Sequence, residues 1–138
     1  MKQIEAIAHN IGMSYKFGTY KEVNHLFDRS DVFPAVAELL QLKGSFELTF
    51  ESVKDSQEIT LLFLDIDGKT VDSGRTGEVV ERMKGKALEF VKALNETNEF
   101  EFIDGVTLQY YTIVKQFDKC LSGLEITLNL KPNTSVCL

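Results

Sequence analysis

Hydrophobic positions in the first part of the chain predict two short helices around an extended segment. Apolar residues between 2 and 12 recur at the spacing of one helix face, so we expect a short helix there. The segment 14–20 is rich in Tyr, Phe and Thr and favours an extended connection. Thr19 and Glu22 then have the spacing of a capping box, which predicts a second helix over about 20–29.

The middle of the chain has strand-like patterns. Residues 33–42 fit a strand or a helix, because Pro34 suits an edge strand and the first turn of a helix equally, and we favour the strand. Apolar and polar residues alternate over 46–51, which predicts a strand with one apolar face, and we expect a turn at 54–57. Residues 58–66 are apolar on both faces at their centre, which is typical of an interior strand.

The second half of the chain predicts one long helix and further strands. One apolar stripe indicates a helix from about 77 to 95, with Thr76 as its cap. Three strands follow, separated by a turn at 104–105 and by a loop at 115–122 that contains Cys120: 99–102, 106–114 and 124–130. We expect 131–138 to be a flexible tail.

This order of elements predicts a single α+β domain over residues 1–138. Consecutive strands joined by short turns pair mostly antiparallel. We therefore expect a mostly antiparallel sheet of about five to six strands, with the long helix and one or two short N-terminal helices packed on one face. The chain has 138 residues, 43% of them hydrophobic and 26% charged, which is enough to bury one core.

Charge and composition argue against several classes of function. The net charge is −6 and the 15 basic residues are scattered, which argues against a nucleic-acid surface. No apolar stretch approaches the ~20 residues of a membrane span, and the first residues lack a signal region, so we expect a cytoplasmic protein. Cys120 and Cys137 lie at no metal-ligand spacing from His9 or His25, so we expect free thiols, no metal and no cofactor.

One stretch has the form of a catalytic motif. The strand 58–66 leads into Asp-Ile-Asp-Gly at 65–68 and Val-Asp-Ser-Gly at 71–74. This pattern resembles the nucleophile strand of haloacid-dehalogenase-like phosphatases. The resemblance implies that Asp65 attacks a phosphoryl group, that Asp67 acts as general acid and base, and that the carboxylates hold Mg²⁺.

The chain departs from this phosphatase pattern in several respects. Lys69 stands where the family has Thr, and about half of the chain precedes the motif, which in the family lies near the start. No later acidic pair at a strand end offers further metal ligands. An Asp-Gly turn after an interior strand satisfies the same pattern. We therefore keep a minimal phosphatase as an alternative and predict no catalytic residues.

Several other segments resemble a different group of proteins. Small uncharacterised proteins encoded in prophages of Bacteroides-type bacteria are similar to this chain at 33–40, 44–48, 80–84, 110–119 and 137–138. The predicted element order is also similar to tail-terminator and neck proteins of long-tailed phages. The resemblance implies a non-enzymatic virion assembly protein for tail completion or head-tail joining. The location that the resemblance implies is the cytoplasm of the bacterial host and, after assembly, the virion.

This resemblance implies contact surfaces in place of an active site. The partners it implies are further copies of the chain in a ring and other phage tail or neck proteins, with no nucleic acid and no membrane. We expect the contacts at edge strands 33–42 and 123–131, at the loop 67–76 and at the C-terminal tail. A third possibility is a small binding module with an apolar pocket between helix 77–95 and the sheet.

Overall fold

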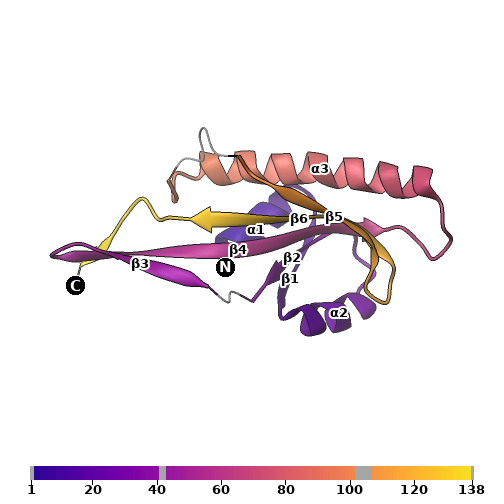
Figure 1. Ribbon diagram of the computed structural model, residues 1–138, viewed down its shortest axis with the longest axis horizontal. Helices are drawn as coiled ribbons and strands as arrows, with labels where there is room; N and C mark the ends of the chain where they lie inside the picture. The colour runs from indigo at the N-terminus through magenta and orange to yellow at the C-terminus, as the bar shows by residue number, and fades with distance from the viewer. Residues whose placement is uncertain (1, 41–42, 102–106, 138) are drawn as a thin grey trace.

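The computed structural model describes residues 2–40, 43–101 and 107–137, which form the α+β fold that the sequence predicts (Figure 1). The elements in chain order are α1 (Lys2–Asn10), β1 (Ser14–Gly18), α2 (Tyr20–Asp28), β2 (Ala35–Leu39), β3 (Gly44–Leu48), β4 (Ser52–Ile66), α3 (Ser73–Glu96), β5 (Tyr110–Gln116), β6 (Leu121–Leu130) and β7 (Val136–Cys137). The single long helix is α3, and no helix in the described ranges has the length and apolar character that crossing a bilayer requires.

The sheet is built around β4, whose two halves have different neighbours. The C-terminal half pairs antiparallel with β2 on one side and with β6 on the other. The N-terminal half pairs with β3 and, over two residues, with β7. Beyond these, β1 pairs with β2 in parallel and β5 pairs with β6 antiparallel, giving the order β1-β2-β4-β6-β5. The predicted antiparallel character is confirmed, and the described residues form more strands than the sequence pattern indicates.

Two apolar clusters cover the two faces of the sheet. On one face, α1 and α3 pack against a row that includes Ile59 and Phe63. On the other, α2 packs Val23 and Phe27 against residues such as Leu62. The C-terminal half of β4 is thus buried on both faces, as its continuous apolar run predicts. The helices were expected on one face; α1 and α3 share one, whereas α2 covers the other.

The first helices and strands follow the local sequence signals. The capping box of α2 is confirmed, since Thr19 Oγ1 accepts a hydrogen bond from the Glu22 amide and the Thr19 amide donates to Glu22 Oε1. The choice of a strand for 33–42 is also confirmed by β2. The parallel pairing of β1 with β2 is not visible in the sequence, because the two strands are separated by α2.

The predicted turn at 54–57 is wrong, because these residues lie inside β4. The chain turns instead at 49–51, where the Thr49 amide donates to the Ser52 carbonyl at 2.9 Å. Polar residues are tolerated in this half of β4 because it pairs with β3, and none of the described helices contacts β3. A polar run therefore marks a solvent-exposed length of strand here and not the end of one.

The start of α3 differs from the prediction as well. Asp72 caps the helix, because its Oδ1 accepts hydrogen bonds from the amides of Gly74 and Arg75. The predicted cap Thr76 lies in the first turn of the helix and donates its hydroxyl hydrogen bond to Asp67. Asp72 and Thr76 are both of residue types that cap helices, and Asp72, which comes first in the chain, caps α3.

The segments after α3 are described in part. The strand predicted at 99–102 is wrong over its described residues, because Phe100 forms only an isolated bridge with Pro132. Phe102 and the predicted turn at 104–105 lie outside the described residues. The strand predicted at 106–114 is observed in part as β5, which starts only at Tyr110 and continues to Gln116. The last strand starts earlier than expected, with Leu121, so the predicted loop 115–122 is shorter than expected. The predicted tail contacts the sheet, since β7 pairs with the start of β4.

Candidate functional site

The acidic turn after β4 gathers four polar side chains around Asp67. This residue is fully buried. Its Oδ2 accepts hydrogen bonds from Thr76 Oγ1 at 2.6 Å and from Ser122 Oγ at 2.7 Å. The Lys115 ammonium lies 3.3 Å from the same oxygen, and Arg75 Nε lies 3.9 Å from Oδ1. Side chains from α3, β5 and β6 therefore meet at one carboxylate beyond the end of β4.

Two opposing effects set the pKa of Asp67. Burial disfavours the charged carboxylate, whereas hydrogen bonds from Thr76, Ser122 and Lys115 stabilise it, together with the positive charge of Lys115. The stabilising contacts outweigh burial, so the pKa of Asp67 lies below its ordinary value. The Asp67 carboxylate therefore carries a negative charge at neutral pH.

The loop that follows Asp67 is closed over it. Lys115 Nζ donates to the carbonyl oxygens of Gly68 at 2.7 Å and Thr70 at 3.0 Å. The Asp67 amide donates to the Cys120 carbonyl at 3.1 Å. These contacts shield the carboxylate from solvent and leave Asp67 Oδ1 as a buried oxygen that accepts no hydrogen bond from the described residues. The cluster therefore joins α3, β5 and β6 to the end of β4.

The two oxygens of Asp65 are both engaged. Oδ2 accepts a hydrogen bond from Arg82 Nη1 at 2.7 Å, and Oδ1 accepts one from the Ile66 amide at 2.8 Å. A nucleophilic carboxylate has to present an oxygen to the phosphorus atom. In the described part of the chain, no group of three or more His, Cys, Asp or Glu side chains lies close enough to hold a metal ion. The structure thus brings Asp65 and Asp67 to the same turn but gives them separate partners.

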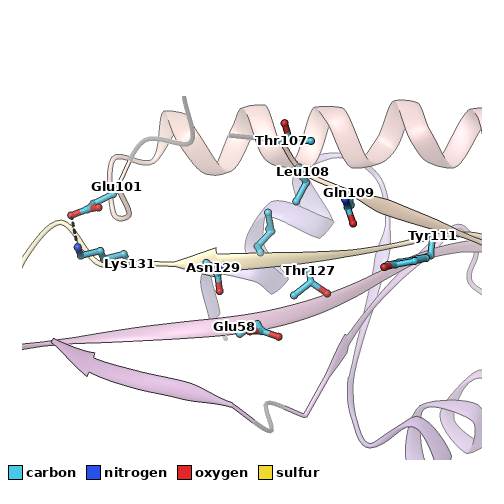
Figure 2. Close-up of a pocket in the computed structure, with 10 residues that line it drawn as sticks. Glu58, Glu101, Thr107, Leu108, Gln109, Tyr111, Thr127, Asn129 and Lys131 are labelled. Atoms are coloured by element: carbon cyan, nitrogen blue, oxygen red, sulfur yellow. Dashed lines mark ion pairs between the residues drawn. The ribbon is translucent and has the colours of Figure 1, made fainter. Parts of the chain in front are cut away.

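A cavity of about 660 Å³ with a mixed polar and apolar lining opens where the chain before β5 diverges from β6 (Figure 2). Glu58, Thr127 and Asn129 line it from β4 and β6, and the Lys131–Glu101 ion pair, at 3.6 Å, lies at one end. Its volume falls within the range of small-molecule pockets. Its lining combines polar side chains with Leu108, Tyr111 and Leu128, so it differs from the apolar pocket that the binding-module alternative predicts.

An apolar groove lies between α3 and β5. Its lining from α3 is Ala87, Leu88 and Val91, with Leu108 and Tyr110 on the strand side. The groove has a volume of about 230 Å³, smaller than the roughly 300–1,000 Å³ of ligand pockets. The Leu88 side chain is 72% exposed. This groove occupies the place of the predicted apolar pocket, but it is a shallow surface feature.

A second apolar surface lies on a projecting part of the sheet. Residues 44–57 and 136–137, which we call the arm, extend past the end of α3 (Figure 1). Three of its side chains are exposed by 71%, 70% and 97%: Phe46, Leu48 and Phe50. Cross-strand pairing places Leu48, Val53 and Val136 side by side on one face of the arm. None of the described helices contacts β3.

Two of the segments expected as contact surfaces do not have the expected place in the sheet. The prediction that 33–42 and 123–131 form edge strands is wrong, because β2 lies between β1 and β4 and β6 lies between β4 and β5. Sequence reasoning identified the apolar alternation at 46–50 but did not identify it as an exposed surface. The signal was the adjacent polar run at 54–57, which indicates that the paired strand also faces solvent.

Comparison of the chain with family models, curated proteins and solved structures finds no match. The molecule is characterised by the features of its fold. It is an α+β domain with a buried acidic turn, an apolar groove beside its long helix and an arm with an uncovered apolar face.

Proposed function

We propose that this chain is a non-enzymatic virion assembly protein of a phage or prophage, which completes a tail or joins head and tail by forming a homo-oligomeric ring. The observation that carries this proposal is the arm. Phe46, Leu48 and Phe50 expose most of their surface at alternate positions of one short segment, and clustered apolar exposure is typical of protein interaction sites.

A ring of identical subunits requires two different surfaces on each subunit, which meet head to tail. The chain offers candidates for both. The arm is one, and the apolar groove between α3 and β5 is the other. The two surfaces belong to different elements, and Figure 1 shows the arm extending away from the part of the sheet that α3 covers. This separation supports assembly with further copies on either side.

The acidic turn also favours an assembly protein over the phosphatase alternative. Both oxygens of Asp65 have hydrogen-bond donors, and Asp67 is an ionised, fully buried carboxylate. These contacts have a clear structural purpose, because they attach the first turn of α3 to the sheet. The turn needs no substrate to account for its residues.

The resemblance to prophage proteins supplies the biological setting of the proposal. It covers segments in β2, β3, α3 and β5, so it is spread over the fold and not confined to one motif. The proposed partners beyond the chain itself are other tail or neck proteins. The proposed location is the cytoplasm of the bacterial host and, after assembly, the virion.

Size-exclusion chromatography with light scattering tests this proposal. We expect a homo-oligomer whose average mass rises with protein concentration, because the exposed apolar surfaces are buried on association. The genomic neighbourhood gives an independent test, with portal, capsid or tail genes expected beside this one. A strict monomer encoded among metabolic genes would contradict the proposal.

A further inference from the structure

We infer that the arm of one copy of this chain docks into the groove between α3 and β5 of the next copy. This inference rests on the proposed function, since it specifies the contact through which the ring forms. The occupant of the groove is thus a second copy of this chain, and the contact joins two different surfaces. Each subunit then uses its arm to bind one neighbour and its groove to bind the other, as a closed ring requires.

The arm has the shape of an inserting element. Side chains on one face of a strand recur about every 7 Å, so Phe46 and Leu48 of β3 lie next to each other on one face and form a short apolar row. Phe50 lies at the turn between β3 and β4 and is 97% exposed. The pairing with β4 extends the arm past the end of α3 (Figure 1), and none of the described helices contacts β3. The row can be covered by another molecule.

The groove matches this row in size and chemistry. Its walls are the apolar side chains of Leu88 and Val91 on the helix and Leu108 on the strand side. Leu124 and Ile126 of β6 form its floor. A space of about 230 Å³ accommodates large apolar side chains, such as those of the arm, better than a separate small molecule.

Charges favour contact between the arm and the groove over contact between two arms or two grooves. Asp55 lies opposite Phe46 on the apolar face of the arm and is exposed, and Glu51 follows Phe50. The groove instead has lysines along its helix: Lys84, which also pairs with Glu81 at 3.0 Å, lines it, and the exposed Lys92 lies one turn beyond Leu88. Like charges would face each other in a symmetric contact, whereas opposite charges meet when an arm enters a groove.

Three single substitutions in the full chain test the contact by analytical ultracentrifugation. We expect Phe50→Asp in the arm and Leu88→Asp in the groove each to weaken self-association at least about 30-fold, the effect of losing one dominant contact residue. Val32→Asp is the matched control, because Val32 is 63% exposed and belongs to neither surface, and it leaves association unchanged. Since all three side chains are exposed, the variants should fold, which thermal melts by circular dichroism verify.

Mixing the two defective variants tests the direction of the contact. The Leu88→Asp chain keeps its arm and the Phe50→Asp chain keeps its groove, so an equimolar mixture should form 1:1 dimers and no larger species. If arms paired with arms, or grooves with grooves, only one variant would lose association and mixing would add nothing; either result overturns the inference. Wild-type oligomers that both substitutions leave intact overturn it too, while the proposed function stands. A monomeric wild type overturns the proposed function as well.

Discussion

The two halves of β4 have the same regular strand geometry but opposite environments. In the C-terminal half, Leu61, Leu62 and Phe63 are fully buried between α1 and α3 on one face and α2 on the other. In the N-terminal half, the strand carries the arm, where the paired residues of β3 remain exposed. A single strand thus links the core to the proposed assembly surface. Apolar alternation alone does not distinguish core from interface; the covering helices do.

The largest expected effect is a contrast in stability between the two regions. Phe63→Ala should lower the free energy of unfolding by about 3–5 kcal/mol, because a buried ring packed 5.5 Å from the ring centre of Phe90 is replaced by a cavity. Phe46→Ala is the matched arm variant and should change the free energy of unfolding of the monomer by less than about 0.5 kcal/mol. Urea unfolding at low protein concentration measures both. Equal losses would contradict the division of β4 into core and arm.

A smaller effect is expected at the end of the core half, where Asp67 is buried. Asp67→Asn should cost about 1.5–3 kcal/mol in free energy of unfolding, because charged hydrogen bonds from Thr76, Ser122 and Lys115 are weakened. The pKa of Asp67 is lower in the folded chain than the roughly 3.9 of an unfolded aspartate. Its contribution is therefore complete above the unfolded pKa and is lost as pH falls through the folded pKa.

The variant should consequently lose less stability than the wild type on acidification. Unfolding curves collected between about pH 5 and about pH 2 measure this difference. Parallel pH dependence of wild type and Asp67→Asn would show that the pKa of the carboxyl group is not lowered in the fold, contrary to the contacts described above.

The smallest effect is expected at Asp65. Asp65→Asn should change the free energy of unfolding by no more than about 1 kcal/mol, because the partner Arg82 is more than half exposed and solvent screens the ion pair. We also expect phosphate release from a generic aryl phosphate with Mg²⁺ to stay at background for wild type and variant alike. Turnover by the wild type that the substitution abolishes would support the phosphatase alternative instead.

Local signals in the sequence predicted the elements better than their surroundings. The capping box at Thr19, the apolar stripe of α3 and the alternation in β6 depend on neighbouring residues, and each is observed. The continuous apolar run at the centre of 58–66 likewise predicted burial on both faces. These patterns indicate which side chains are buried, and the spacing that indicates burial lies within each element.

The remaining features depend on residues that are far apart in the chain. The partners of Asp67 include Ser122, 55 positions away, and no spacing rule connects the two. Phe46 and Leu48 have the same alternation as Ile59 and Leu61, yet only the latter pair has a helix above it. Whether an apolar row is covered depends on where α1 and α3 end, and the sequence of the row does not contain that information.

The arm also has a consequence for biosynthesis. Its β3–β4 hairpin is complete once residue 57 has left the ribosome, whereas the groove needs α3, Leu108 and the middle of β6. Every nascent chain therefore carries an exposed apolar hairpin before any groove exists to receive it, and on a polysome such hairpins are close together. The charges interspersed there, Glu47, Lys54 and Asp55, are of the kind that keeps unpartnered strands from aggregating. The arm therefore has to stay soluble during synthesis and, in the proposed assembly, to bind another copy afterwards.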